Sequence, residues 1–591
     1  MNTKHWSFQA LPETTHDFDV IEHLKSAVQL PDRLAILLWQ RGIHTFDHAK
    51  DFFRPSLESL HDPFLMRDMP EAIERLSLAL DRQEKIVVFG DYDVDGTTAV
   101  ALVYGFLSKL TTQLDFYVPD RYKEGYGISK QGIEWAVSQG ITLMIALDCG
   151  IKAIQEVEYA RTLGLDMIIC DHHEPGETIP KAVAVLDPKR SDCPYPFKEL
   201  SGNGVGFKLM QALCMHRSIP FDELWPFLDL CVVSIGADIV PIIGENRILA
   251  FYGLKKLNES ACIGLSALKK VAGFTEPMTI ENVVFILGPR INAAGRIFHA
   301  KAAVELLLSQ NFDNAWAMAQ EIQAYNMQRR ELDSSITEEA IRMIQEDAWL
   351  SNEAQSTVLY NPQWHKGVIG IVASRCIEKV YRPTIILTQS HDVAAGSARS
   401  VEGFDLYAAL EACSSWLIQF GGHTHAAGMT ILPENIPGFR QAFDEEVKRR
   451  LEEENRVPKV RIDLSLTLAD ITPKFFRIMR QMGPFGPKNM QPVFMTQNLK
   501  LVNPPVILKE KHLKLQVMEE SSGTSFVALG FGMAEDFYER LLKNESFALT
   551  YTIDENNFRG QVSLQLMIKD IKWKDDFHQL TNLTQIEYSF N

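Results

Sequence analysis

The sequence lacks the features that mark secreted and membrane proteins. Its eight cysteines are scattered and form no CxxC pair, so buried free thiols in a reducing cytoplasm are the favoured interpretation. The first residues, Met1 to Trp6, lack the apolar core of a signal peptide. No apolar run reaches the ~20 residues of a membrane span, because Asp229 and Asp238 interrupt the candidate from Leu228 to Ile243. We therefore expect a cytoplasmic protein that does not enter the membrane.

The sequence also has no excess of positive charge. Its formal net charge is −17, which argues against nucleic-acid binding over most of the surface, because phosphate neutralisation needs local Lys and Arg. The segment from Pro484 to Lys514 differs, since it holds five lysines and only one acid, Glu510. A locally basic module can hold a polyanion while the rest of an acidic protein stays soluble. The five lysines are Lys488, Lys500, Lys509, Lys511 and Lys514.

The length of 591 residues is enough for several domains, and the chain shows no internal repeat or low-complexity tract. From Lys85 to about Leu254, short apolar runs alternate with helix-like segments, which is typical of a doubly wound parallel sheet. A second α/β region starts near Ser356. Its predicted strands are Thr357–Tyr360 and Thr384–Leu387, on either side of a helix from Gly370 to Val380.

Two further regions have a different periodicity. From Ala303 to Gln345, apolar residues recur at helical spacing among many charged residues, which predicts a long helical connector. Beyond Val457, short alternating stretches predict a small all-β domain. These stretches are Leu513–Val517, Phe526–Gly530, Phe547–Ile553 and Val562–Ile568. Residues 1 to about 80 are predicted to be mostly helical.

Four apolar runs in the first α/β region end in polar residues. Lys85–Phe89 leads into Gly90-Asp91-Tyr92-Asp93-Val94-Asp95-Gly96, Leu143–Leu147 ends at Asp148, Met167–Cys170 ends at Asp171-His172-His173, and Ala182–Leu186 ends at Asp187. In open α/β sheets the functional site lies beyond the carboxyl ends of the strands, so these side chains should converge in one crevice. Acids packed so closely repel one another unless cations lie between them. The sequence therefore predicts a site for divalent metal ions.

Each motif also has a structural alternative. The three acids before Thr97 could form an Asx turn or a helix N-cap, although the flanking Gly90 and Gly96 would let the backbone approach ions closely. A single histidine is usually a satisfied core residue, whereas His172 and His173 stand beside an acid at a strand end. Neighbouring residues of an extended strand point in opposite directions. We therefore expect one imidazole to bind metal and the other to face the substrate or support a ligand.

Two more acids lie in apolar surroundings further along the chain. Asp238, within Val233 to Pro241, would be costly to bury without a partner, which makes it a candidate metal ligand. Asp229 competes for this role. Its helical surroundings favour a structural or partly exposed acid instead.

Taken in order, the motifs resemble those of the DHH phosphoesterase superfamily. They are Asp93-Val94-Asp95-Gly96, Asp148, Asp171-His172-His173 and Ala237-Asp238. Later segments resemble the bacterial RecJ single-stranded-DNA exonucleases, namely Gly288 to Arg296, Gly396 to Ser400, Phe420 to Gly428 and Gly483 to Phe494. The match covers nearly the whole chain in the right order. One motif would identify only the superfamily, whereas the set identifies the family.

This resemblance implies a multidomain α/β fold. A doubly wound DHH domain and a smaller DHH-associated α/β domain would face each other across a cleft, joined by a long helix, and a C-terminal OB-like β domain would complete a ring. The expected boundaries are 1–80 for a helical lead-in, 81–255 for the DHH domain, 256–350 for the connector, 351–456 for the DHH-associated domain, 457–575 for the OB-like domain and 576–591 for a tail.

The resemblance also implies a site for two divalent cations, Mn²⁺ or Mg²⁺. It carries over Asp93, Asp95, Asp148, His172 and Asp238 as ligands, with Asp148 as the bridge between the ions. One position departs from the superfamily, because Phe89 stands where many members have a histidine. Asp91 could supply the missing oxygen. His173 would position or protonate the reacting phosphate.

Substrate contacts follow from the same resemblance. Residues expected to clamp phosphates are Arg290, Asn292, Arg296, Arg375, Ser397, Arg399 and His423. The planar fork of arginine suits that task, although each arginine could instead form a surface ion pair. Lys488, Lys511 and Lys514 of the basic segment would guide the strand, and aromatic residues such as Phe526 could stack on bases.

The expected activity is therefore metal-dependent hydrolysis of single-stranded DNA to 5′-mononucleotides, in DNA repair and recombination. The 5′-to-3′ polarity comes from the resemblance alone, as do the expected partners, a single-strand-binding protein and a RecQ-type helicase. We expect a monomer. Two alternatives stay open: a phosphodiesterase for short oligonucleotides or cyclic dinucleotides, and a non-catalytic single-strand-binding relative.

Overall fold

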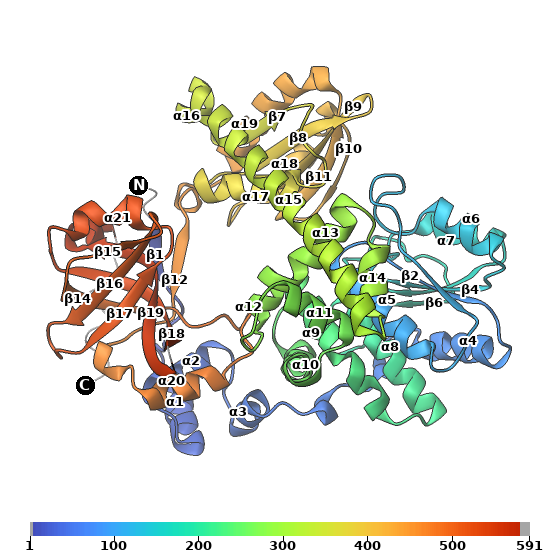
Figure 1. Ribbon diagram of the computed structural model, residues 1–591, viewed down its shortest axis with the longest axis horizontal. Coiled ribbons are helices and arrows are strands. Elements are labelled where there is room, and N and C mark those ends of the chain that lie inside the picture. The colour runs from blue at the N-terminus through green and yellow to red at the C-terminus, as the bar shows by residue number, and fades with distance from the viewer. Residues whose placement is uncertain (1–3, 559, 580–591) are drawn as a thin grey trace. The chain divides into compact units, whose positions relative to one another are not determined.

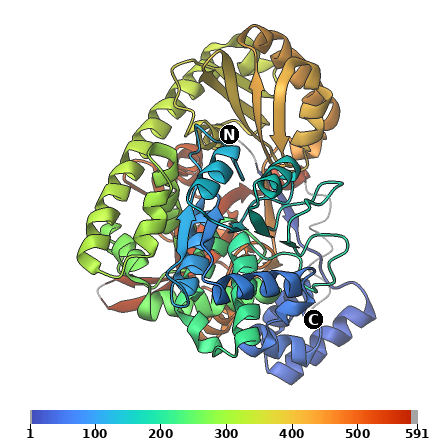
Figure 2. The same ribbon diagram turned by 90° about the vertical axis from the view of Figure 1, so that its right-hand side faces the viewer.

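The computed structural model describes residues 4–558 and 560–579, which form two compact units. The parallel-sheet unit consists of Arg54–Ser335 and Pro484–Met490. The composite unit contains the described residues up to Phe53, then Ile336–Gly483, and then those from Gln491 onward. Figure 1 and Figure 2 show the helices and strands of both units in two views. Residues 580–591 of the predicted tail lie outside the described residues.

The parallel-sheet unit is built around five parallel strands in the order β3-β2-β4-β5-β6. They are β2 (Ile86–Gly90), β3 (Leu114–Tyr117), β4 (Leu143–Leu147), β5 (Asp166–Cys170) and β6 (Ala184–Leu186). β2, β4 and β6 are buried along their whole length, because helices cover both faces of such a sheet, and this explains their nearly continuous Val, Ile and Leu. The sequence predicts four of the five strands. It misses β3, which is short and partly exposed.

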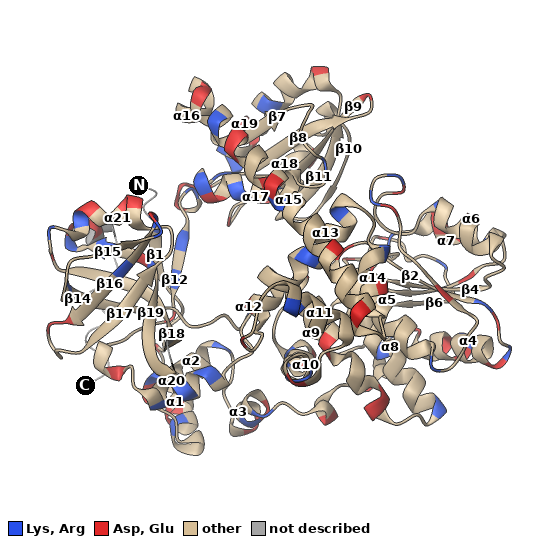
Figure 3. Cartoon of the chain, viewed as in Figure 1, with Lys and Arg blue, Asp and Glu red and all other residues tan. Residues whose placement is uncertain are grey.

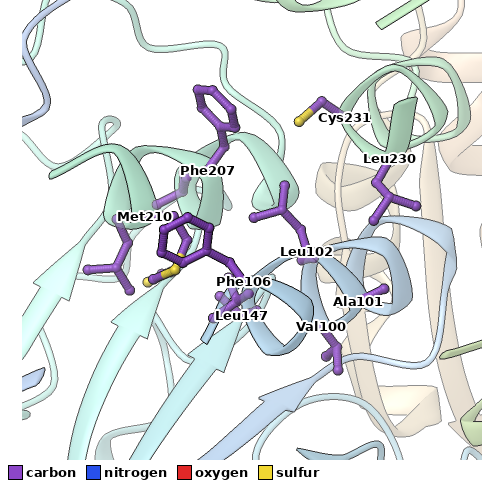
Figure 4. Packing of buried hydrophobic residues seen from close by; sticks show 14 of the residues in the cluster. Val100, Ala101, Leu102, Phe106, Leu147, Phe207, Met210, Leu230 and Cys231 are labelled. Carbon is purple, nitrogen blue, oxygen red and sulfur yellow. The ribbon is translucent and has the colours of Figure 1, made fainter. Parts of the chain in front are cut away.

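Helices connect and cover these strands. They are α4 (Met69–Asp81), α5 (Val94–Leu107), α6 (Lys130–Ser138), α7 (Ile154–Thr162) and α8 (Gly202–Arg217). Side chains cap the N-termini of α5 and α8, where Asp93 accepts from the Gly96 amide and Ser201 accepts from the Gly204 amide. Residues of α5, α8 and β4 share one fully buried cluster (Figure 4). This packing fixes the helix N-termini that flank the strand ends.

The rest of the parallel-sheet unit is helical. Its elements are α9 (Leu228–Ala237), α10 (Gly244–Ser260), α11 (Ile263–Val271), α12 (Ile280–Asn282), the π-helix η4 (Val283–Leu287), α13 (Gly288–Ile297) and α14 (Lys301–Leu307). Leu265, Ala294 and Val304 belong to the same core as the sheet. Most of the predicted connector 256–350 is therefore packed against the sheet core, because its apolar faces are buried there.

Within the predicted connector 256–350, all of which the structure describes, the one long helix is α15 (Phe312–Glu346). It is visible in both views (Figure 1, Figure 2). It starts at Phe312 rather than at the predicted Ala303. Asn311 causes the break, since its side chain accepts from the Asn314 amide at 3.0 Å and so begins a new helix after α14. The boundary between the two compact units falls within α15, after Ser335.

The composite unit contains a five-stranded sheet in the order β10-β11-β9-β8-β7. Its strands are β7 (Thr357–Tyr360), β8 (Thr384–Ser390), β9 (Val393–Arg399), β10 (Leu417–Gly422) and β11 (Ala426–Ile431), and its helices are α16 (Ala348–Asn352), α17 (Ile369–Lys379), α18 (Leu406–Ala412) and α19 (Ile436–Arg450). β7 and β8 are parallel, whereas the other pairs are antiparallel. The glycines of the family-like segments from Gly396 to Ser400 and from Phe420 to Gly428 lie within β9, β10 and β11. At Gly396 a Cβ atom would come within 2.5 Å of the Leu387 side chain, so β8 and β11 can pack closely over it.

A second sheet of seven strands forms the predicted OB-like domain, in the order β13-β14-β18-β19-β17-β16-β15. The strands are β13 (Leu464–Ser465), β14 (Phe494–Leu501), β15 (Val506–Leu508), β16 (His512–Glu519), β17 (Ser525–Gly530), β18 (Phe547–Phe558) and β19 (Gln561–Trp573), with helices α20 (Pro473–Gln481) and α21 (Ala534–Leu541). Inward residues of β16 alternate with exposed ones, as expected for a sheet with one solvated face.

The N-terminal segment belongs with this β domain. β1 (His5–Phe8) pairs in parallel with β12 (Lys459–Ile462), and the Trp6 indole donates to Asp570 Oδ2 at 2.7 Å. The helices α1 (Thr15–Val28), α2 (Asp32–Gln40) and α3 (Phe46–Phe53) follow. The predicted lead-in 1–80 is thus divided between the two units. Local helical periodicity could not reveal this pairing.

The predicted basic module is also divided. Pro484–Met490 belongs to the parallel-sheet unit, where the Ile242 amide donates to the Pro487 carbonyl at 2.8 Å. Lys488 lies in this loop, whereas Lys511 and Lys514 lie in the seven-stranded sheet domain. The five lysines therefore do not form one module. Lys and Arg are interspersed with Asp and Glu in both units (Figure 3).

Candidate metal centre

Asp95 lies in the first turn of α5, directly after β2, and is 1% exposed. Its Oδ2 accepts from the Gly202 amide at 2.7 Å, and its Oδ1 accepts from the Asn203 amide at 2.8 Å. The Ser234 hydroxyl donates to Oδ1 at 2.7 Å. Amides at a helix N-terminus stabilise a carboxylate. The first turn of α8 therefore holds the Asp95 carboxylate in a fixed orientation.

Asp148 follows β4 in the left-handed backbone region, with φ of 59°. This conformation is uncommon for an aspartate, and the Asp148 amide is held by the Cys170 carbonyl at 2.8 Å. A Cβ atom on Gly202 would come within 2.6 Å of Asp148 Cβ and Oδ1. Glycine at position 202 is thus required for the Asp148 carboxylate to fit beside α8.

His172 and His173 follow β5 and approach the same carboxylate. His172 Nε2 lies 3.2 Å from Asp148 Oδ1, and one nitrogen of each ring belongs to a group of possible ligand atoms with Asp148 that all lie within 4.8 Å of one another. The expectation that the two rings point in opposite directions is wrong. The reason is that the chain has left the extended strand conformation at this point, so the alternation of a strand no longer applies.

Asp171 fixes His172 and His173 through hydrogen bonds. Its Oδ1 accepts from the amides of His172 and His173 and from His173 Nδ1, at 2.7, 3.2 and 2.7 Å respectively. Its Oδ2 accepts from the Ile151 amide at 2.9 Å. Burial opposes ionisation, yet the hydrogen bond from His173 and the other donors lower the pKa of Asp171 to about 2. The same bond, against the effect of burial, raises the pKa of His173 to about 9.

Asp238 reaches the centre from a helix rather than from a strand. It forms the C-cap of α9, and its Oδ2 lies 3.6 Å from His172 Nε2. The next residue, Ile239, has φ of 61°, which is strained for a β-branched side chain. Asp229, on the first turn of the same helix, is fully buried and accepts from the Cys262 amide at 2.6 Å. Of the two alternatives predicted for Asp229, a structural or a partly exposed acid, the structure has the structural one.

The ligand atoms fit divalent cations. Asp95, His172 and Asp238 form a second group of possible ligand atoms within 4.8 Å of one another, so the two groups share His172. Three polar atoms in the centre are buried and have no hydrogen-bond partner among the described residues: Asp91 Oδ1, Asp148 Oδ1 and His172 Nε2. Carboxylate and imidazole ligands in combination suit Mn²⁺, and carboxylates also accept Mg²⁺.

The electrostatics agree with a site that requires positive charge. Burial, followed by the carboxylate of Asp95, raises the pKa of Asp148 and of Asp238 well above the usual value. Burial also lowers the pKa of His172, which favours the neutral imidazole that can bind a metal ion. A cation within the cluster would reverse the cost of ionising these acids.

Two further predicted site residues, Asp93 and Asp91, differ from the ligands described above. Asp93 caps α5 by accepting from the Gly96 amide at 3.0 Å, so the structural alternative holds for this carboxylate, and it is absent from both ligand groups found in the described chain. Asp91 is buried beside it, and burial together with Asp93 raises the pKa of Asp91 well above the usual value. Phe89 is a core residue that stacks on Tyr117.

The predicted phosphate contacts of the parallel-sheet unit lie on α13. Arg290 donates to Gln323 Oε1 at 2.9 Å and to the Ile286 carbonyl at 2.6 Å, so this guanidinium already joins α13 to α15. The Arg296 carbonyl accepts from Tyr122 at 2.5 Å. Asn292 lies on the same helix. A Cβ on Gly295 would be 2.9 Å from the Tyr92 carbonyl, which places the end of α13 against the loop after β2.

The remaining predicted contacts lie in the composite unit. Arg399 Nη1 donates to Ser397 Oγ at 3.2 Å and to the Ala398 carbonyl at 2.8 Å. A Cβ on Gly370 would come within 2.8 Å of Ser397 Oγ and 2.9 Å of Arg399 Nη2. The structure thus brings Ser397 and Arg399 together beside the start of α17, which also carries Arg375. His423 lies in the turn between β10 and β11.

The structure adds two groups that the prediction of site residues omitted. Tyr126 donates to the Asp148 carbonyl at 3.0 Å and its hydroxyl lies 3.3 Å from His173 Nε2. Asp187 follows β6 and is fully buried, and burial with the nearby Asp171 charge raises the pKa of Asp187 to about 7. The position of Asp187 after an apolar run was a signal for this placement. Tyr126 lies in a loop and had no such signal.

Comparison with known proteins extends these observations to the whole chain. Three family models match: the N-terminal domain of the DHH family over residues 85–235, the DHHA1 domain over residues 353–449 and the RecJ OB domain over residues 462–570. The single-stranded-DNA-specific exonuclease RecJ of Bacillus subtilis is 38% identical over 558 residues, covering 94% of this chain and 70% of that protein. Its counterpart from Escherichia coli is 32% identical over 571 residues, covering 94% of this chain and 98% of that protein.

Solved structures show the same similarity. The crystal structure of RecJ from Thermus thermophilus in complex with Mn²⁺ matches with a TM-score of 0.82 and 26% identity, covering 96% of this chain and 79% of that chain. The complex of the same protein with Mg²⁺ matches with a TM-score of 0.77 and 25% identity, covering 96% and 78% respectively.

Proposed function

We infer the activity of this chain from its family, because the chain belongs to the RecJ single-stranded-DNA-specific exonucleases. It is an enzyme that hydrolyses phosphodiester bonds of single-stranded DNA from the 5′ end and releases 5′-mononucleotides, in DNA repair and recombination. One observation supports this most strongly. Carboxylate oxygens of Asp95, Asp148 and Asp238 all lie within 3.7 Å of His172 Nε2, which follows the parallel strand β5.

The centre holds two divalent cations, Mn²⁺ or Mg²⁺. We propose that Asp95, Asp148, His172 and Asp238, which all belong to the two ligand groups, would hold them. The assignment of Asp148 as the ligand shared between the ions rests on the family resemblance. Asp93 is proposed to contribute the carboxylate oxygen that does not cap α5. When bound, such cations activate a water molecule and stabilise the leaving oxygen of a phosphodiester.

His173 is proposed to position or protonate the reacting phosphate. Its Nδ1 is fixed by Asp171, whose hydrogen bond and charge raise the pKa of the imidazole to about 9 against the effect of burial. A protonated imidazole can donate a hydrogen bond to a phosphate oxygen and stabilise the charge that develops there. The Tyr126 hydroxyl lies 3.3 Å from Nε2 of the same ring. Asp91, whose Oδ1 is buried without a hydrogen-bond partner among the described residues, is proposed to supply the oxygen that the substitution of Phe89 for a histidine leaves missing.

Phosphate binding away from the cations is assigned to three places. The first place is α13, with Arg290, Asn292 and Arg296. Ser397 and Arg399 form the second, supported by their contact at 3.2 Å and by the space that Gly370 leaves beside them, with Arg375 and His423 as further contacts. Lys511 and Lys514 on the seven-stranded sheet form the third. Lys488 contributes from its separate loop.

The cellular setting is also a proposal. All eight cysteines are free, and seven of them are buried, which suits a reducing cytoplasm. Among the described residues, no helix is both long enough and apolar enough to cross a membrane. A monomeric state, and cooperation with a single-strand-binding protein and a RecQ-type helicase, rest on the family resemblance. The domain boundaries 81–255, 351–456 and 457–575 are proposed on the same basis.

A product assay tests the function. The substrates are a long 5′-labelled single strand and the same strand within a blunt duplex, each incubated with Mn²⁺, Mg²⁺ or a chelator. We expect labelled mononucleotide as the first product, from the single strand only and only with a cation. Labelled intermediates that shorten stepwise would contradict the 5′-to-3′ polarity. Hydrolysis in the chelator would contradict the metal dependence.

A further inference from the structure

Asp238 is the least enclosed of the proposed cation ligands. Its side chain is 28% exposed, whereas those of Asp95 and Asp148 are 1% and 3% exposed. Within the residues that the structure describes, no hydrogen bond reaches the Asp238 carboxylate, although three donors fix that of Asp95. The side chain of Asp238 therefore takes its position from the main chain that carries it. The contacts of that main chain decide how Asp238 meets Asp95.

Ser234 makes the first connection between the helix of Asp238 and Asp95. It lies one turn before Asp238 on α9, and its carbonyl accepts from the Asp238 amide at 2.9 Å. Its hydroxyl donates to Asp95 Oδ1 at 2.7 Å, and its Oγ lies 2.6 Å from Ser201 Oγ at the start of α8. The last turn of α9 is thus held against the acid that α8 orients.

Asn246 makes the second connection from the first turn of α10, where it is fully buried. Its Nδ2 donates to the Pro241 carbonyl at 3.1 Å and also to the Glu199 carbonyl. Pro241 lies three residues after Asp238. Glu199 lies just before α8, whose first amides hold Asp95. A primary amide has two N–H donors, so this one group joins the main-chain segments of both acids.

The surroundings of Asn246 fix its position relative to α8. The neighbouring Glu245 accepts from the Tyr195 hydroxyl at 2.6 Å. Glu245 also forms a fully buried ion pair with Lys208 of α8 at 2.6 Å. The first turn of α10 is therefore anchored to α8, and Asn246 can hold the Pro241 segment against it.

Asn246 is an unfavourable choice for a residue that only fills space. Its Oδ1 is buried and has no hydrogen-bond partner among the described residues, which costs free energy. An apolar side chain of similar size would avoid this cost. It could not connect two carbonyls, so the connection is what the asparagine provides.

We propose that Asn246 is a positioning residue, which sets the separation of Asp95 and Asp238 and through it the affinity for one of the two cations. This role rests on the proposed function, since it concerns the cation of the ligand group that contains Asp238. The other ligand group includes Asp148 and His173, which follow β4 and β5, and Asn246 makes no hydrogen bond to these strands in the described chain. Loss of the Asn246 amide should therefore weaken one cation and spare the other. A residue needed only for stability would affect both alike.

Calorimetric titration of Mn²⁺ into the metal-free, full-length protein tests this role without nucleic acid. The wild type should bind two ions. Asn246→Ala should bind one of them about 10- to 100-fold more weakly, the range for residues that support metal ligands, and the other within about twofold of wild type. Asn258→Ala is the matched control, because Asn258 also links α10 to another main-chain segment, accepting from the Met278 amide at 2.7 Å and donating to the Met278 carbonyl at 3.0 Å. It should bind both ions normally.

A double-mutant cycle shows whether Asn246 acts through Asp238. In protein that carries Asp238→Ala, the added Asn246→Ala should change Mn²⁺ affinity by less than about twofold, because the ligand that it positions is gone. Asn246→Asp is a second variant, which decides the question if Asn246→Ala does not fold. It keeps the shape of the side chain but has at most one donor, so it should weaken the same cation. Thermal unfolding verifies that each variant is folded.

Several results would overturn the proposal. Equal weakening of both cations in Asn246→Ala, or an equal effect of Asn258→Ala, would make Asn246 an ordinary structural residue. So would a full further loss of affinity when Asn246→Ala is added to Asp238→Ala. A wild type that binds two ions, with both Asn246 variants binding them equally well, would overturn the positioning role and leave the proposed function standing. A wild type that binds no Mn²⁺ and hydrolyses no single strand would overturn the proposed function, and the positioning role with it.

Discussion

The parallel sheet and the seven-stranded sheet of this protein present polar groups in different ways. In the parallel sheet, β2, β4 and β5 all end at the same edge, so Asp95, Asp148 and His172 meet there although they lie far apart in the sequence. In the seven-stranded sheet, most neighbouring strands run in opposite directions, so no single edge gathers strand ends.

This difference affects how firmly each surface is built. The centre at the parallel strand ends is fixed by buried amides, as in the two hydrogen bonds that the first turn of α8 donates to Asp95. The groove beside α20 is lined by the exposed side chains of Arg477 and Arg480, and Arg480 forms an exposed ion pair with Glu555. Substitutions in the first region should therefore cost far more activity than substitutions in the second.

The largest effect is expected for Asp148→Ala. Asp148 is the proposed ligand of both ions, so its removal should reduce the rate of hydrolysis by at least about a thousandfold. The protein should remain folded, since removal of an acid relieves repulsion with Asp95. Asp115→Ala on the exposed part of β3 is the control and should keep near-wild-type turnover. Turnover of Asp148→Ala close to wild type at saturating Mn²⁺ would refute the assignment.

A smaller loss is expected for Gly202→Ala, which leaves every ligand in place. The added Cβ would lie 2.6 Å from Asp148 Oδ1, so the carboxylate must shift. Supporting residues of metal sites typically contribute about 10- to 100-fold in affinity or activity, and we expect a loss in that range for Mn²⁺ affinity by calorimetry. Gly204→Ala on the same helix meets its nearest neighbour at 3.3 Å and should be much milder. Equal losses in both variants would show a general defect of α8.

Arg399→Ala should slow hydrolysis by about 10- to 100-fold, the cost of one charge-assisted contact of roughly 1.5–3 kcal/mol. Metal content should not change, because Arg399 belongs to the composite unit. Single-turnover rates on a 5′-phosphorylated strand, with metal analysis of the same sample, test this. Normal strand affinity combined with reduced metal content would make Arg399 a structural residue.

Metal removal should make stability depend on pH. Asp148 and Asp238 have folded-state pKa values raised well above the usual value by burial and then by Asp95. Between about pH 4 and the folded-state pKa, the folded protein therefore binds more protons than the unfolded chain, and the free energy of unfolding falls as pH rises. Mn²⁺ stabilises the ionised cluster and removes this loss. The gap in Tm between metal-loaded and chelated protein should widen from pH 5 to pH 8, and a constant gap would contradict the prediction.

The smallest effect concerns the seven-stranded sheet. Lys511→Ala with Lys514→Ala should weaken binding of a long single strand and reduce the slope of log affinity against log salt by about 0.7 for each lost phosphate contact. Substitution is preferable to removal of everything after Arg456, because that truncation would also remove Pro484–Met490 from the parallel-sheet unit and uncover Trp6. Lys85→Ala, at the exposed residue just before β2, is the control. An unchanged slope would show that the two lysines only solvate the surface.

Several elements could be predicted from local pattern alone. The predicted strands Leu143–Leu147 and Thr357–Tyr360 have the same bounds in the structure, because a short apolar run between polar residues specifies a buried strand. The long helix predicted from Ala303 began too early, since the apolar spacing of α14 and α15 continues across the break at Asn311. Periodicity reports which face is buried and not which neighbour buries it.

The sequence by itself determined which strands are buried and that acids and imidazoles stand where those strands end, because both depend on residues that are neighbours in the chain. Only the tertiary structure decided that Asp238 joins them from a helix, that Gly202 leaves space for Asp148, and that β1 pairs with β12. These contacts join segments that are distant in the sequence. They arise from the packing of whole elements against one another, and no local pattern of residues encodes that packing.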